Sequence, residues 1–157
     1  MARHPSLEEA ERICRRHALP LTLQRRMILE ALAPRADHPT ADGILAEVRE
    51  RAPEISRTTV YRVLEAFVRV GVAQKVCHPG AAARYEMVRT RHHHLVCLAC
   101  GRMTDFEDPR LDRLPLPGSK AQGFQVADYS IQFRGKCAGC ARAAAKRGRS
   151  AKRKKDK

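Results

Sequence analysis

Two Cys-x-x-Cys pairs constrain the fold of this chain more than any other feature of its sequence. They are Cys97-Leu-Ala-Cys100 and Cys137-Ala-Gly-Cys140, and residues 101–136 separate them. Two residues between cysteines let both thiolates of a pair bind one ion about 2.3 Å away, and two such pairs complete a closed tetrahedral zinc site. The spacing therefore predicts that a structural zinc ties a strand near Cys97 to the C-terminal end of the fold. A disulfide or a redox role is the alternative.

The expected compartment favours metal over disulfides. Residues 1–11 carry acidic and basic side chains where a signal peptide needs an apolar run, and no stretch approaches the roughly 18 apolar residues of a membrane helix. We therefore expect a cytoplasmic protein without a membrane segment, whose thiols stay reduced. Of the two remaining cysteines, Cys14 is expected in the core, whereas Cys77 is either an ordinary side chain or a metal ligand.

The chain is strongly basic. Lys and Arg total 31 against 17 Asp and Glu, which gives a net charge of +14. Such an excess favours a polyanionic partner, either nucleic acid or an anionic membrane surface. More than half of it, +8, lies in residues 142–157. That tail is predicted to be disordered, and it either keeps the protein soluble or adds salt-sensitive DNA affinity.

The first half of the chain shows helical periodicity and then changes to strand alternation. Four residues can cap helices: Ser6, Thr22, Thr40 and Ser56. Each of them precedes an apolar stripe at helical spacing. After Gly71, two short runs flank a Pro79-Gly80 turn, which is typical of a β-hairpin. Helices followed by a hairpin predict a winged helix-turn-helix.

The second half contains short strand-like runs. They are Leu95–Leu98, Arg102–Phe106 and Phe124–Phe133. Pro109 and Pro115 lie between the second and third runs and mark that segment as loop or broken helix. We therefore expect short strands joined by a long irregular connection.

A histidine run lies immediately before the first cysteine pair. In a strand, residues two apart point to the same face, so His92 and His94 can share an ion while His93 points away. Three further donors lie on neighbouring predicted elements: His38, Glu86 and Asp105. Imidazole and carboxylate ligands together suit Fe²⁺, Mn²⁺ or Zn²⁺ and disfavour a thiolate-seeking metal. The alternative is an exposed polar patch.

Taken in order, these segments resemble the Fur (ferric uptake regulator) family of metal-dependent repressors. The resemblance extends from about Leu7 to Ala144. It is carried by Leu21-Thr-Leu-Gln-Arg-Arg26, His38-Pro-Thr-Ala-Asp42, Ser56-Arg-Thr-Thr-Val-Tyr-Arg-Val-Leu64, Arg84-Tyr-Glu86, His92-His-His-Leu-Val-Cys-Leu-Ala-Cys-Gly101 and the Cys137/Cys140 pair.

The resemblance implies an α+β fold and a function in gene control rather than catalysis. The expected domains are a winged helix-turn-helix over residues 1–88, a small α/β dimerisation domain over residues 89–141, and the basic tail over residues 142–157. The protein is expected to be a homodimeric repressor that binds palindromic operators in double-stranded DNA. The implied cofactors are a structural Zn²⁺ and a regulatory Fe²⁺ or Mn²⁺.

Carried over position by position, the resemblance implies two metal sites. The structural zinc ligands would be Cys97, Cys100, Cys137 and Cys140, and the regulatory ligands would be His38, Glu86, His92, His94 and Asp105. Glu86 stands where zinc-sensing members have Cys and peroxide-sensing members have Asp, whereas Asp105 does suit the peroxide sensors. Iron or manganese sensing is therefore favoured, with peroxide sensing as the alternative. Arg91 and Tyr129 stand where a further site of iron-sensing members would need histidines.

The helix that follows Ser56 is the expected recognition element. Its apolar stripe leaves Arg57, Thr58, Tyr61 and Arg62 outward, where arginine can contact guanine or phosphate and tyrosine can pack on thymine methyl groups. An ordinary solvated helix is the alternative reading of this face. Two rival functions remain: a metal-dependent hydrolase using the histidine and carboxylate cluster, and a zinc-binding RNA or ribosome-associated module.

Overall fold

The structure is a computed structural model, and it divides into two compact units, Met1–Thr90 and Arg91–Lys157. It describes residues 6–77, 81–88, 91–115, 123–124, 126 and 128–145. The hairpin turn at Pro79-Gly80 and most of the basic tail therefore lie outside the described residues. No helix in these ranges is both long and apolar enough to cross a membrane.

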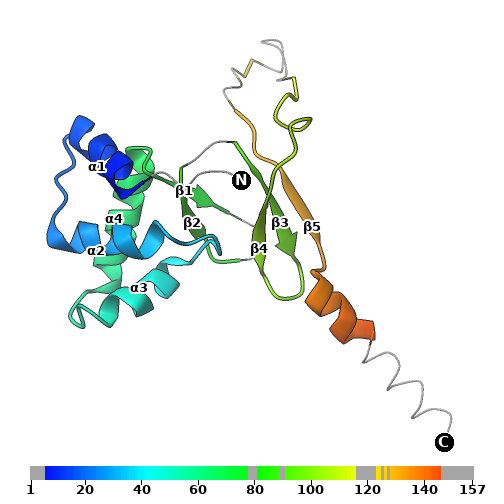
Figure 1. Ribbon diagram of the computed structural model, residues 1–157, viewed down its shortest axis with the longest axis horizontal. Helices are drawn as coiled ribbons and strands as arrows, with labels where there is room; N and C mark the ends of the chain where they lie inside the picture. Colours follow the sequence, from blue (N-terminus) through cyan, green and yellow to red (C-terminus); the bar gives the residue numbers. More distant parts are fainter. Residues whose placement is uncertain are drawn as a thin grey trace, which may run out of the picture. The chain divides into compact units, whose positions relative to one another are not determined.

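The first unit consists of four helices followed by a two-stranded antiparallel sheet (Figure 1). The helices are α1 (Leu7–Arg16), α2 (Leu23–Leu32), α3 (Ala41–Arg49) and α4 (Arg57–Arg69), and the strands are β1 (Ala73–Val76) and β2 (Arg84–Met87). This order confirms the helices and hairpin predicted for a winged helix-turn-helix.

Each helix of this unit begins where its sequence predicts. Ser6, Thr22, Thr40 and Ser56 all adopt extended backbone, and the side-chain oxygen of each accepts a hydrogen bond from the amide three residues later. Such a cap satisfies one of the amides that the first helical turn leaves without a backbone partner, and it contributes about 1 kcal/mol. The helix starts are thus determined locally by short polar side chains.

The core of the first unit is formed by the apolar stripes of the helices and by the inner face of β2. Ile28, Ile44 and Phe67 are fully buried, and Tyr85 from β2 packs into the same cluster. Cys14 is also fully buried in this cluster, which confirms its predicted place in the core. Because the helices turn their apolar faces inward, the opposite face of α4 is left in solvent.

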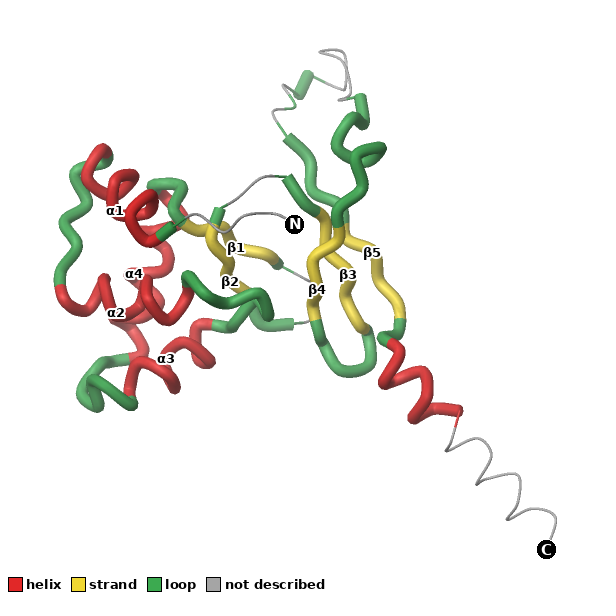
Figure 2. Tube along the Cα trace, viewed as in Figure 1, coloured by secondary structure: helices red, strands yellow, loops and turns green. Residues whose placement is uncertain are grey.

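The second unit is built around a three-stranded sheet in the order β4-β3-β5 (Figure 2). Strand β3 (His93–Cys97) pairs antiparallel with β4 (Met103–Phe106) and parallel with β5 (Gln132–Gly135). Residues 138–145 then form a helix, which includes the first four residues of the predicted tail. The central position of β3 places the histidine run and the first cysteine pair in the middle of the sheet.

The predicted strand Phe124–Phe133 is wrong over most of its length. The strand begins only at Gln132, and the described residues before it, including the exposed Phe124, are irregular. The Tyr129 hydroxyl donates to the carbonyl of Leu111 and accepts from the amide of Leu114, so this side chain holds the segment against a loop rather than in the sheet. The alternation of apolar residues does not reveal these hydrogen bonds of Tyr129, so the sequence predicted a strand that begins too early.

Candidate metal centres and nucleic-acid interface

The four cysteines of the two Cys-x-x-Cys pairs come together in the second unit. The sulfurs of Cys97, Cys100, Cys137 and Cys140 all lie within 4.8 Å of one another, and none forms a disulfide. The sulfurs of Cys100 and Cys137 are 3.9 Å apart. Sulfurs bound to one zinc ion at about 2.3 Å in tetrahedral geometry lie roughly 3.8 Å apart. The donor set and its spacing therefore fit zinc.

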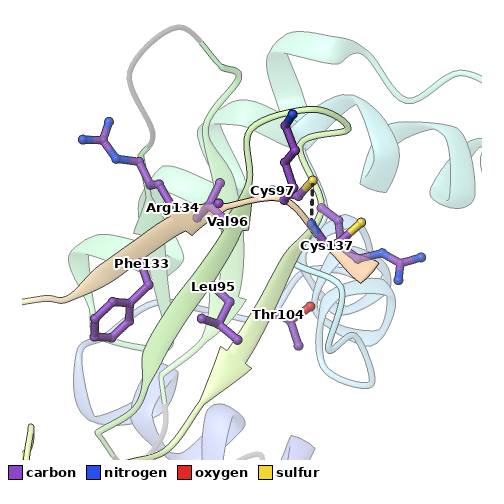
Figure 3. Close-up of a pocket in the computed structure, with 10 residues that line it drawn as sticks. Leu95, Val96, Cys97, Thr104, Phe133, Arg134 and Cys137 are labelled. Atoms are coloured by element: carbon purple, nitrogen blue, oxygen red, sulfur yellow. Dashed lines mark hydrogen bonds between the residues drawn. The ribbon is translucent and has the colours of Figure 1, made fainter. Parts of the chain in front are cut away.

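One tight chain reversal and one strand pairing build this cluster. The carbonyl of Cys97 accepts from the amide of Gly101, whose φ of +70° lies in the left-handed region that glycine enters readily. Strand β5 runs parallel to β3, so its end brings Cys137 beside the end of β3. The amide of Cys137 donates to the Cys97 sulfur at 3.3 Å (Figure 3). The parallel pairing thus joins two segments that are far apart in sequence.

Hydrogen bonds shift the thiol pKa values in opposite directions. Backbone amides lower the pKa of Cys97 to about 6, that of Cys137 contributing most, followed by those of Cys100 and Ala99. Hydrogen bonding to Cys137, and then to Cys100 and Cys97, raises the pKa of Cys140 to about 12. The clustered sulfurs therefore do not all ionise without a cation among them. A divalent ion bound among the sulfurs provides the positive charge that stabilises the thiolates, and each coordinated thiol is then deprotonated.

A buried His–Glu pair lies in the first unit. The His38 Nε2 is 2.9 Å from a carboxylate oxygen of Glu86, and both side chains are almost completely buried. The other oxygen of Glu86 accepts from the Gln74 amide at 2.6 Å. His38 has a φ of +53°, which for a residue other than glycine costs about 1–3 kcal/mol. The Arg84 side chain donates to the His38 carbonyl at 2.7 Å and helps to hold this strained backbone in place.

A second group of nitrogen and oxygen donors lies at the start of β3. The Nε2 atoms of His92 and His94 are 3.2 Å apart, and each is 3.8 Å from one oxygen of Asp105. Strand register explains this grouping, because His94 and Asp105 are directly opposed on β3 and β4. Two imidazole nitrogens bound to one ion at about 2.1 Å at a right angle lie roughly 3 Å apart. The separation of the two histidines therefore fits shared coordination.

His93 points to a different environment from its two neighbours. Its Nε2 lies 3.1 Å from an oxygen of Asp112, and the ring is buried. This agrees with the alternation that the sequence predicts for His92, His93 and His94. The alternative of an exposed polar patch is wrong, because all three rings are buried.

Arg91 and Tyr129, which the resemblance aligns with two histidines of iron-sensing members, form a contact of their own. The guanidinium carbon of Arg91 lies 4.4 Å from the Tyr129 ring centroid, and the same side chain is 2.7 Å from a carboxylate oxygen of Asp128. The stacking and the ion pair hold a permanent positive charge at this point. A guanidinium has no lone pair to offer a metal ion, so Arg91 does not supply the ligand that a histidine would.

The outer face of α4 carries all four residues expected to contact nucleic acid. Arg57, Thr58, Tyr61 and Arg62 are exposed. Acidic side chains lie beside this face, and the sequence did not predict them there. The carboxylate of Asp42 binds Arg57, and the carboxylate of Glu65 lies 2.7 Å from the Lys75 ammonium on β1. Sequence patterns reveal ion pairs only between residues three or four apart on one helix. Asp42 lies on α3 and Lys75 on β1, so neither pair could be predicted in this way.

Comparisons with known proteins agree with this architecture. The model of the "Ferric uptake regulator family" matches residues 16–134. The "Peroxide operon regulator" of Bacillus subtilis (strain 168) is 32% identical over 142 residues, which cover 90% of this chain and 97% of the relative. The solved structure of the Vibrio cholerae ferric uptake regulator is 29% identical, with a TM-score of 0.65 over 81% of this chain and 98% of that one. That of the Helicobacter pylori regulator, 23% identical, has a TM-score of 0.75 over 90% and 97% of the two chains and supports the fold alone.

Proposed function

Because the chain belongs to the ferric uptake regulator family of metal-dependent, DNA-binding repressors, we propose that a single Fe²⁺ or Mn²⁺ ion switches its homodimer to tight operator binding. The operator is a palindrome in double-stranded DNA, and the protein acts in the cytoplasm beside it. Its relatives are transcriptional regulators, which excludes the hydrolase reading. We assign the regulatory ligands to His38, Glu86, His92, His94 and Asp105, and the structural zinc ligands to Cys97, Cys100, Cys137 and Cys140.

The observation that carries this proposal is the pairing of buried donors in each unit. The first unit offers His38 and Glu86 at 2.9 Å, and the second offers His92 and His94 at 3.2 Å. Buried imidazole and carboxylate groups without thiolate suit iron or manganese. A bound ion would supply a positive charge, and ligands from both units would coordinate it together.

Ligands drawn from both units explain how occupancy can control DNA binding. His38 and Glu86 belong to the unit that carries α4, and His92 belongs to the other unit, so shared coordination restrains one unit against the other. In a two-fold dimer, that restraint sets the separation of two recognition helices, which has to match half-sites about 34–36 Å apart. A 100-fold preference of the metal for the matching arrangement shifts the equilibrium by about 2.7 kcal/mol.

A binding experiment tests the proposal and the role of α4. Tyr61→Ala is expected to weaken binding to a palindromic duplex by about 1–3 kcal/mol, because the ring contact with the base edges is lost. The duplex is first selected from a random pool with Mn²⁺-loaded protein, and affinities are then measured by fluorescence anisotropy. Tyr61→Phe is the matched control and is expected to retain most of the affinity. Equal binding by Tyr61→Ala, or wild-type preference for RNA, would contradict the assignment.

Peroxide sensing is the second candidate, favoured by the similarity to the Bacillus subtilis regulator. We expect Fe²⁺-loaded protein to keep its DNA binding when micromolar peroxide is added anaerobically. The reason is that Glu86 replaces the Asp that the resemblance implies for peroxide sensors. Mass spectrometry of the His38 and His92 peptides gives an independent measurement. Rapid loss of binding, with a gain of about 16 Da from one added oxygen, would establish the peroxide alternative instead.

A further inference from the structure

We infer that Asp42 is a positioning residue for sequence recognition, because its carboxylate orients the Arg57 guanidinium to contact one guanine in each operator half-site. This inference rests on the proposed function, since it requires α4 to lie in the major groove. Asp42 was not among the residues expected to contact DNA. It lies in the first turn of α3, and Arg57 is the first residue of α4.

The contact between the two side chains is bidentate. The Arg57 Nε donates to Oδ1 of Asp42 at 2.8 Å, and its Nη2 donates to Oδ2 at 2.9 Å. Two parallel hydrogen bonds hold the planar guanidinium in one orientation, which a single bond does not achieve. Both side chains are more than half exposed, and exposed ion pairs contribute little to stability. The significance of this pair is therefore orientation rather than stabilisation of the fold.

The contact leaves the far end of the guanidinium available. Of its five N–H groups, Asp42 binds one on Nε and one on Nη2. The Nη2 atom also lies 3.4 Å from the Tyr61 hydroxyl, a long and weak hydrogen bond. Among the described residues, no contact engages Nη1 of Arg57. The Nη1 and Nη2 end is the part that donates to O6 and N7 of guanine, the commonest specific arginine contact in DNA recognition.

Tyr61 further limits the movement of this side chain. It lies one helical turn after Arg57 on the same face of α4, and the guanidinium carbon is 5.4 Å from the centroid of its ring. An arginine free of such contacts has about 2 kcal/mol of rotamer entropy to lose, and it reaches phosphates as readily as bases. Phosphate contacts carry no sequence information. The carboxylate and the ring together therefore favour base recognition.

The test measures sequence preference with the full-length, zinc-containing homodimer loaded with Mn²⁺. A palindromic duplex is selected from a random pool with the wild-type protein, and each base pair of one half-site is then changed in turn. We expect Asp42→Asn to lower discrimination at one G·C pair at least fivefold and to keep the other preferences. Arg57→Lys is expected to lose preference at the same base pair, because an ammonium lacks the rigid planar fork with which a guanidinium donates to O6 and N7 together.

Glu30→Gln is the matched control for Asp42→Asn. It also removes one exposed acid that pairs with an arginine, here Arg51 at 3.1 Å, so it changes net charge equally. We expect it to leave every base preference unchanged. Thermal unfolding and zinc content establish that all variants fold, and the asparagine of Asp42→Asn is close in size to the aspartate.

Two results would overturn the inference while leaving the proposed function intact. In the first, Asp42→Asn keeps the wild-type preference at every position. In the second, Asp42→Asn and Arg57→Lys weaken binding to all sequences equally and change the salt dependence, which identifies Arg57 as a phosphate contact. A wild-type protein without metal-dependent sequence preference would instead overturn the proposed function itself.

Discussion

Replacing Cys137 with Ser is expected to remove about one zinc ion per chain and to leave an aggregating or monomeric protein. Cys137 has the central place in the cluster, because its amide donates to the Cys97 sulfur and its own sulfur is 3.9 Å from that of Cys100. Structural zinc sites have apparent binding free energies of roughly 10–16 kcal/mol, and this binding energy stabilises the fold directly. A unit with a three-stranded sheet has little core with which to offset that loss.

The measurement combines zinc analysis by mass spectrometry with size-exclusion chromatography. The matched control is Cys77→Ser, which changes an exposed thiol of the first unit and is expected to keep both zinc and dimer. The same result is expected for Ser at Cys97, Cys100 or Cys140, since each removes one of four ligands. A fully folded, zinc-free dimer from any of these variants would disprove the assignment of the cluster.

The second large effect is expected for Glu86→Gln, which should abolish metal-dependent DNA binding while the zinc and the dimer persist. The side-chain amide that this substitution introduces is nearly the same size as the Glu86 carboxylate, so the buried position stays filled. It nevertheless lacks the negative charge that a buried divalent ion requires from its ligands. Affinity for the selected duplex at saturating Mn²⁺ is then expected to fall about 100-fold, to the level of the metal-free wild type.

Fluorescence anisotropy with and without Mn²⁺ measures this effect, and mass spectrometry measures the retained zinc. Asp112→Asn is the matched control, because Asp112 lies beside His93 and outside the assigned ligand set. It is expected to respond to metal as the wild type does. If Glu86→Gln still bound the operator in a metal-dependent way, Glu86 would not be an essential ligand, and the proposed ligand set would be wrong.

Several features of the fold and the sites could be predicted from the sequence because they depend on neighbouring residues. The side chains of Thr22 and Ser56 cap an amide only three residues later, so the start of each helix follows from the local sequence. Strand alternation likewise predicts that the side chains of His92 and His94 point to one face and that of His93 to the other, as the structure has them. A cysteine pair with two intervening residues is also local, and its chemistry is recognisable wherever the chain folds.

Other features were decided by tertiary structure, because they join residues whose separation in sequence carries no pattern. The parallel pairing of β5 with β3 sets where β5 begins and brings Cys137 to Cys97. Asp42 reaches Arg57 only because α3 packs against α4. His38 keeps its left-handed backbone where Arg84, distant in sequence, binds its carbonyl. Side-chain chemistry along the chain thus indicates which groups can act as ligands, whereas packing between elements determines how those groups are oriented.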